Sequence, residues 1–295
     1  MVSYITQIAN NRDWTKKSLF KNSLIDLMGA PFIYEERDKI DDILLQNYPD
    51  FQNEVFPIID SVNVDLFRQL AFIEGIDFLF RAINFCQAIQ YLLINGFYSP
   101  AQSMSYQAAF YCARSILGLS GVYCSEIKSK DFILDVYYNQ NQSINEYCIN
   151  SVRRNHQVMW NLLAKVIQIS IVDDFIVEKS IFNILKGVNY ASCSNLRHHI
   201  HYYNKYNFID LFNKKEYESY LIDLIDLETI NNNCDYFDLL CLFLIFSSNL
   251  FLSIAMYSQG LEDMIKKYKI LLRKEDNEIL VKRHVFDKIK GYDSI

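Results

Sequence analysis

The sequence predicts a mainly α-helical protein with one small β-hairpin. Hydrophobic residues make up 51% of the 295 residues and charged residues 22%, so the chain can bury a sizeable core. It contains only 8 Gly and 4 Pro, whereas a sandwich or barrel of many strands needs frequent tight turns. The sequence has no GxGxxG or GxxxxGKS/T motif and therefore indicates neither a Rossmann nor a P-loop nucleotide site.

Residues 1–60 are expected to form a helical extension. Two short amphipathic helices, at 16–29 and 35–47, are separated by the helix breaker Gly29-Ala30-Pro31. A long helix should then run over 61–95. It should stop at Asn95-Gly96, because glycine readily adopts the left-handed conformation that ends helices.

The next helix, 99–119, is the expected antiparallel neighbour of this long helix, because the connection between them is short. Ser99 should be its N-cap and Pro100 its first helical residue. Arg114 should lie in the last turn, where a cation offsets the helix dipole. Small residues recur at helical spacing and should let the neighbouring helix approach closely. They are Ala101, Ser105, Ala108, Ala109 and Cys112.

The periodicity changes from helical to strand-like after this helix. Residues 122–127 and 132–138 should form a β-hairpin, inserted at 121–140. The Asn/Gln-rich stretch that follows, 139–150, is expected to be a loop.

Helices resume after the hairpin within a helical domain expected over residues 61–261, and a charged C-terminal helix is expected at 262–295. Acidic residues interleave with the many basic residues of that last helix, so we expect a solvated face there. The helices expected beyond the hairpin are 151–169, 175–187, 195–205, 214–229, 234–260 and 262–290.

The segment 239–257 could be mistaken for a transmembrane helix. It carries no formal charge over 19 residues, which is just long enough to span a bilayer. Ser247, Ser248 and Asn249 interrupt it, however, and no basic flank follows until Lys266. A helix that is apolar all round is also typical of the centre of a helical domain, so we favour a buried core helix over membrane insertion.

The seven cysteines and the N-terminal residues indicate a cytoplasmic protein. The number of cysteines is odd and no CxxC occurs, so we expect reduced core thiols with neither a disulfide framework nor a zinc site. The first residues lack the basic region and the long apolar run of a signal peptide.

Charge is distributed unevenly. The net charge of −6 argues against a broad surface that coats nucleic acid. Residues 150–215, in contrast, contain nine Lys/Arg, four Asp/Glu and four of the five histidines, a local charge of 9 − 4 = +5. This clustering is either chance or a local anion-attracting site.

An unusual constellation, NLRHHIHYYN at 195–204, lies inside this basic stretch. On a helix, Arg197 and His201 are four residues apart and share a face. An imidazole can take the proton of an attacking RNA 2′-hydroxyl or deliver one to the leaving oxygen, while a guanidinium holds the phosphate. We therefore hypothesise metal-independent RNA cleavage, with Arg197 as the phosphate clamp, His201 as the general acid/base, and Tyr203 or His198 assisting.

Three other interpretations of these residues remain open. The histidines can be plain surface or capping residues. His198 and His201 could bind a metal ion, but no carboxylate follows until Asp210, so we expect no metal. Cys193 and His198 could form a nucleophilic pair, although no third, activating group is indicated.

A second, weaker cluster is Arg153-Arg154-Asn155-His156, just before Trp160. Cations in the first turn of a helix oppose its dipole, so a phosphate or an acidic neighbour would have to hold them there. We favour the alternative that the helix starts later and these residues are solvated. Trp14 and Trp160 are expected to be core or interface anchors.

The segment FYSPAQSMSYQAAFYCARSILG, residues 97–118, resembles the second helix of HEPN-like domains, an aromatic- and Ala-rich run ending in Ala-Arg/Lys-x-Leu-Leu. The segment around Arg197 resembles the functional signature of these domains, an Arg followed by four to six residues and a His. His201-Tyr202-Tyr203 is similar to the His-x-Tyr of one toxin–antitoxin branch. The resemblance implies a compact up-and-down helical bundle that is commonly dimeric.

The resemblance also implies a function. Active members of the family are metal-independent ribonucleases of toxin–antitoxin, abortive-infection and other antiviral systems of prokaryotes. An effector of such a system would need no cofactor. Its partners would be a second copy of the chain, RNA, and a cognate antitoxin or other defence-system protein.

The spacing in this chain departs from the family signature. Only three residues separate Arg197 from His201, one fewer than the signature requires. An enzyme and a non-catalytic module that binds protein or RNA therefore both remain open. The non-catalytic module would act through a dimer or partner interface, for which the apolar 239–257 helix is the candidate surface.

Overall fold

The computed structural model describes residues 55–58, 61–127, 130–135, 144–149, 156–169, 179–191, 193, 236–255, 263 and 265–268. Most of these residues are helical, which confirms the prediction of a mainly α-helical protein. The helices are α4 (Ser61–Ile94), α5 (Tyr98–Leu119), α6 (His156–Ile169), α7 (Lys179–Gly187) and α10 (Tyr236–Ala255). The predicted helices at 16–29, 35–47, 195–205 and 214–229 lie outside the described residues, as does Trp14.

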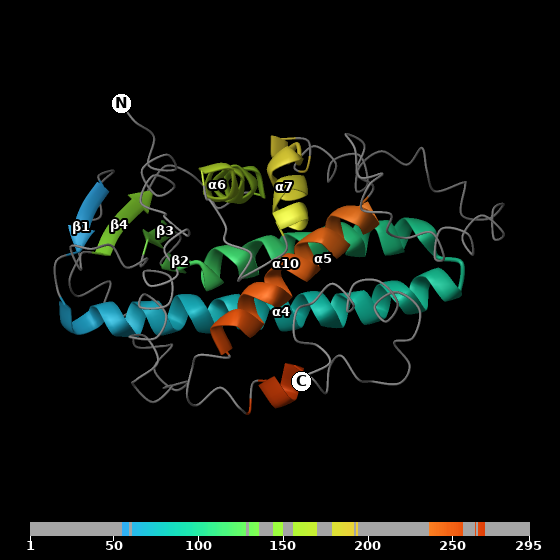
Figure 1. Ribbon diagram of the computed structural model, residues 1–295, viewed down its shortest axis with the longest axis horizontal. Coiled ribbons are helices and arrows are strands. Elements are labelled where there is room, and N and C mark those ends of the chain that lie inside the picture. The colour runs from blue at the N-terminus through green and yellow to red at the C-terminus, as the bar shows by residue number, and fades with distance from the viewer. Residues whose placement is uncertain are drawn as a thin grey trace.

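Helices α4 and α5 form a long antiparallel pair that runs the length of the fold (Figure 1). The turn between them follows the prediction, because Gly96 has a φ of 80°. The Gly96 amide bonds to the Leu93 carbonyl at 3.0 Å and the Phe97 amide to the Leu92 carbonyl at 2.8 Å. These two hydrogen bonds form a Schellman motif, which ends α4.

The start of α5 differs from the prediction. Phe97, and not Ser99, occupies the N-cap, and no side chain caps the helix. Pro100 lies in the first turn, which tolerates proline because the first backbone N–H groups of a helix have no partner within it. The predicted start of the helix, at Pro100, is therefore two residues later than the observed start at Tyr98, and the predicted N-cap, Ser99, is wrong.

The two helices pack backbone to backbone where Gly75 of α4 meets Gly118 of α5. A β-carbon on Gly118 would lie 2.7 Å from the Ala71 carbonyl oxygen and 2.8 Å from the Gly75 α-carbon. The small residues predicted to permit close packing are fully buried along the rest of α5. Those small residues are Ala101, Ser105, Ala108, Ala109 and Cys112.

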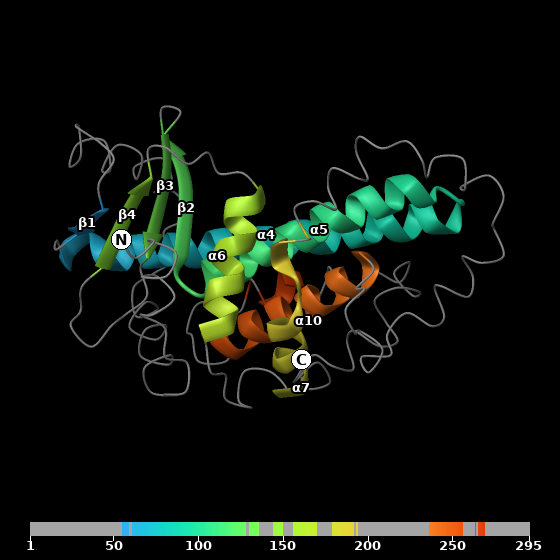
Figure 2. The same cartoon turned by 90° about the horizontal axis from the view of Figure 1, so that it is seen from above.

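Helix α10 crosses α4 and α5 diagonally (Figures 1 and 2). Its side chains at 239, 240 and 242–252 are all at most 4% exposed, so the apolar segment is a core helix, as predicted. The Ser247 hydroxyl lies 2.6 Å from the Ser115 hydroxyl of α5, which satisfies a polar group inside this contact. Among the described residues, no helix has the length and apolar character that a bilayer crossing demands.

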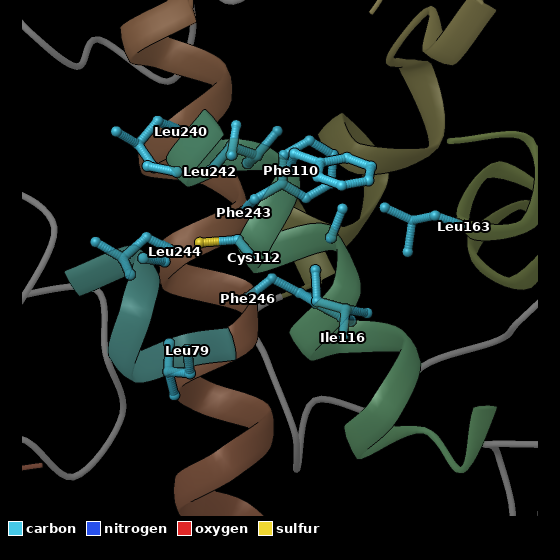
Figure 3. Packing of buried hydrophobic residues seen from close by; sticks show 14 of the residues in the cluster. Leu79, Phe110, Cys112, Ile116, Leu163, Leu240, Leu242, Phe243, Leu244 and Phe246 are labelled. Carbon is cyan, nitrogen blue, oxygen red and sulfur yellow. The ribbon is translucent and has the colours of Figure 1, made fainter. Parts of the chain in front are cut away.

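The burial of α10 bears on the suggested non-catalytic module. The sequence analysis suggested 239–257 as a dimer or partner surface. The described side chains of α10 are instead buried against the chain's own helices. Figure 3 shows Phe243 and Phe246 of α10 packed among residues of α5, with Leu79 of α4 and Leu163 of α6 nearby. Hydrophobic burial within the domain accounts for the apolar character of this helix.

A four-stranded antiparallel sheet lies at the end of the helix pair where α4 begins and α5 ends (Figure 1). The strands are β1 (Val55–Ile58), β2 (Val122–Ile127), β3 (Lys130–Asp135) and β4 (Ile144–Ile149), in the order β1-β4-β3-β2. Pro57 lies in edge strand β1, where a residue without an N–H is tolerated. Val122 and Ile133 are buried, so the sheet contributes to the same core as the helices.

The sheet is larger than the sequence analysis predicts. A hairpin alone was expected, with 139–150 as a loop, but β4 lies inside that stretch and pairs with both β3 and β1. The Asn- and Gln-rich composition around β4 has a low strand propensity, and pairing on both sides overrides it. A helical extension was expected over 1–60. Within that range the structure describes only residues 55–58, and they form strand β1.

Three cysteines lie among the residues whose side chains are described. Cys86, Cys112 and Cys193 are buried free thiols, in agreement with the prediction of reduced core cysteines. Burial raises the pKa of the Cys86 thiol from 9.0 to about 12, because the thiolate would lose its hydration.

The raised pKa of Cys86 makes stability depend on alkaline pH. The unfolded thiol ionises near pH 9 and the folded thiol only near pH 12, so this contribution is complete below pH 9 and is lost as pH rises through that window. The slope should approach about 1.4 kcal/mol per pH unit. Urea unfolding between pH 8 and 11 should therefore show a shallower pH dependence for Cys86→Ala than for the wild type. Equal slopes for the two proteins would refute the assignment.

Candidate functional site

The residues predicted to carry the chemistry lie outside the described part of the chain. Arg197, His198, His201 and Tyr203 all fall in 194–235, so their geometry stays a prediction. The structure does describe the residues just before them. Tyr190 is 3% exposed, and its hydroxyl donates to the Leu185 carbonyl at 2.9 Å. Cys193, four residues before Arg197, is 2% exposed.

The Tyr190 side chain packs in the hydrophobic core of the domain. Its ring lies 6.3 Å from the ring of Trp160 on α6 and 6.0 Å from the ring of Phe243 on α10. Trp160 is fully buried, which confirms its predicted role as a core anchor. Tyr190, seven residues before Arg197 in the sequence, therefore packs against both α6 and α10.

Two polar clusters occur in the described part of the domain, and the first is centred on Arg114. Its guanidinium forms an ion pair with Glu74 of α4, and its Cζ atom lies 3.8 Å from the centroid of the Phe78 ring. Glu74 is 7% exposed, so the pair is largely withdrawn from water. The prediction that Arg114 offsets the dipole of its helix is wrong, because α5 continues to Leu119 and has no basic residue in its last turn.

The second cluster, which we call the His156 cluster, comprises Tyr106, Phe110, His156 and Trp160. The Tyr106 hydroxyl lies 2.9 Å from Nδ1 of His156, and the Trp160 indole N–H donates to the same hydroxyl at 3.2 Å. The imidazole also stacks on the Phe110 ring with the centroids 4.0 Å apart. His156 is half-buried, whereas the other three side chains are buried.

The chemistry of the donor fixes one of these two hydrogen bonds. An indole N–H can only donate, so the Tyr106 oxygen accepts from Trp160. The same oxygen retains a proton and a second lone pair, so it donates to Nδ1 of His156 in one tautomer of the imidazole and accepts from Nδ1–H in the other. The buried tyrosine and tryptophan therefore hold the orientation of a half-buried histidine.

The sequence analysis indicated the members of this cluster only in part. His156 appeared there as one of four residues in a weak basic cluster, and Tyr106 as part of an aromatic-rich helix. The two are 50 residues apart, so no local pattern links them. Within the ranges that the structure describes, no three His, Cys, Asp or Glu side chains form a group that could hold a metal ion.

Comparison with known families finds one match, which covers part of the α4/α5 helix pair. Residues 77–143 match the family model of the HEPN domain. This chain contains a HEPN-like domain. The matched region of the HEPN-like domain spans the second half of α4, all of α5, and strands β2 and β3. It therefore includes both the segment 97–118, which carries the resemblance in the sequence, and the Arg114 and Tyr106 positions described above. Neither the curated proteins nor the solved structures include a match to this chain.

Proposed function

We propose that this protein is a HEPN-like effector of a prokaryotic toxin–antitoxin or phage-defence system and cleaves RNA without a metal ion. The HEPN match over 77–143 carries the proposal, because domains of this family are often nucleases or parts of toxin and defence systems. The up-and-down bundle and the commonly dimeric state of such domains belong to the proposal as well. A second copy of the chain and RNA are the expected partners, together with an antitoxin or other defence-system protein.

The proposed chemistry rests on Arg197 and His201. His201 would take the proton of the attacking 2′-hydroxyl or supply one to the leaving oxygen. Arg197 would hold the phosphate and stabilise the charge that develops in the transition state. His198 and Tyr203 would assist. The basic stretch 150–215, with a local charge of 9 − 4 = +5, supports binding of a polyanion in this part of an otherwise acidic chain.

The non-catalytic alternative now depends on the residue spacing and on the acidic net charge of −6. Arg197 and His201 are one residue closer than the family signature requires, and this spacing favours a module that binds RNA or protein without cleaving it. A further support was the apolar 239–257 helix, but its described side chains are buried in the domain core.

The test is RNA cleavage by the purified protein in EDTA, with Arg197→Ala/His201→Ala as the main variant. We expect at least about a 100-fold loss of cleavage in this variant, because general acid–base catalysis and charge stabilisation each contribute about that much or more. His199→Ala is a matched control, since it removes a neighbouring histidine to which no role is assigned. Cleavage that persists in the double variant, or a wild type that never cleaves, would contradict the catalytic proposal.

A further inference from the structure

We infer that the outer surface of helices α6 and α7, which we call the α6/α7 face, binds the RNA backbone through Lys165 and Lys186. The inference rests on the proposed function for its ligand, RNA. It adds a binding surface outside the Arg197 segment, and the structure describes the side chains that form it.

Helix α6 presents one polar side to the surface. Gln157, Asn161 and Lys165 are exposed, and their spacing of four residues places them along the same side of the helix. The opposite side packs in the core, with side chains at most 3% exposed. Those buried side chains are Met159, Trp160, Leu162, Leu163, Val166 and Ile167. The polar side is therefore open to a ligand over about two turns of the helix.

Helix α7 extends this polar surface. It contacts α6, and the two helices lie on the same side of the α4/α5 pair (Figures 1 and 2). Asn183 is exposed and Lys186 is partly exposed, whereas Phe182 is buried. The Lys186 ammonium lies 5.0 Å from the centroid of the Phe182 ring, and that ring stacks on Phe246 of α10. A ring anchored in the core thus holds this cation at the surface.

The charges of the α6/α7 face favour an anion. The helices contain three lysines and no Asp or Glu, a local charge of 3 − 0 = +3 in a chain of net charge −6. Within the part of the chain that the structure describes, neither Lys165 nor Lys186 forms an ion pair. Both cations are therefore available to phosphates, whose neutralisation releases counterions from the nucleic acid.

The uncharged residues of the face favour RNA over a protein partner. Its three exposed amide side chains can donate and accept hydrogen bonds, and such groups contact phosphate and sugar oxygens in nucleic-acid interfaces. The centre of a protein interface is instead enriched in aromatic and other apolar residues. Among the described residues, the exposed large hydrophobic side chains all lie outside α6 and α7. They are Tyr91, Ile94 and Phe97.

The test measures binding separately from cleavage. The probe is a fluorescent single-stranded RNA made entirely of 2′-O-methyl nucleotides, which lacks the attacking hydroxyl. Fluorescence anisotropy gives the affinity of the full chain for this probe at several salt concentrations. Lys165→Gln/Lys186→Gln should bind the probe about 10-fold more weakly at about 0.15 M salt. The slope of log K against log salt should become shallower by about 1.4, because each phosphate contact to a single strand contributes about 0.7.

Lys266→Gln/Lys267→Gln is the matched control. These two lysines are exposed, and their replacement changes the net charge by the same amount. The segment 265–268 lies on the other side of the α4/α5 pair from α6 and α7 (Figure 1), and the exposed Asp263 precedes it. This variant should bind the probe with the affinity and the salt slope of the wild type. Circular dichroism confirms that each variant is folded.

The outcomes separate this inference from the proposed function. A wild type that cleaves RNA, together with a Lys165→Gln/Lys186→Gln variant that keeps the wild-type affinity and salt slope, would overturn the inference and leave the nuclease intact. An equal loss of binding in the control variant would overturn it too, because any exposed lysine would then serve. Binding that is weakened only in the Lys165→Gln/Lys186→Gln variant of a protein that never cleaves RNA would sustain the inference and contradict catalysis.

Discussion

Glu74→Ala should lower the free energy of unfolding by about 3 kcal/mol, because it leaves the charge of Arg114 without its carboxylate in a largely buried place. The Arg114 side chain is only 20% exposed and its Cζ atom lies 3.8 Å from the centroid of the Phe78 ring, so water can hydrate the unpaired charge only in part. Urea denaturation at neutral pH measures the change. Because the pair joins α4 to α5, the loss should affect the whole cooperative transition.

A matched variant separates charge burial from packing. Glu74→Leu/Arg114→Met removes both charges and keeps side chains of similar size, and it should be nearly as stable as the wild type. A Glu74→Ala protein within about 0.5 kcal/mol of the wild type would show that the pair behaves like an ordinary surface ion pair.

Gly118→Ala should destabilise the fold by about 2 kcal/mol. The new methyl group would meet the Ala71 carbonyl oxygen at 2.7 Å and the Gly75 backbone at 2.8 Å, and backbone atoms cannot rotate away. Overpacking of this kind costs about 1–3 kcal/mol or more, and the better helix propensity of alanine offsets up to about 1 kcal/mol. The measurement is the free energy of unfolding in urea.

The matched control for this substitution is Gly187→Ala. Gly187 ends α7, and a β-carbon there would have no neighbour within 4 Å. Alanine should therefore leave stability unchanged or raise it by no more than about 1 kcal/mol. If both variants behaved alike, the close approach of α4 and α5 at Gly118 would be excluded.

Local patterns in the sequence were sufficient to predict the long helices. The stop at Asn95-Gly96 and the burial of α10 were predicted because a glycine after a helix and an all-apolar helix have direct local causes. Strand β4 was missed because its pairing with β3 and β1 is a property of the sheet and not of the Asn/Gln-rich segment itself.

The same distinction applies to the functional residues. Arg114 was assigned to the helix dipole because its partner, Glu74, is 40 residues away in sequence. The His156 cluster likewise depends on the packing of α5 against α6. Arg197 and His201 were proposed from their spacing alone, and that spacing is one residue short of the family signature. The prediction of a HEPN-like domain used this signature together with the 97–118 segment, and of the two only the 97–118 segment lies within the family match.

The central claim is that this HEPN-like protein cleaves RNA by attack of the 2′-hydroxyl on the adjacent phosphate. The chemical identity of the product ends tests it most directly. Purified wild-type protein is incubated with a defined RNA in EDTA, and the ends are identified by mass spectrometry. The account predicts 2′,3′-cyclic phosphate and 5′-hydroxyl ends. Products with 5′-phosphate and 3′-hydroxyl ends, or cleavage that EDTA abolishes, would contradict it.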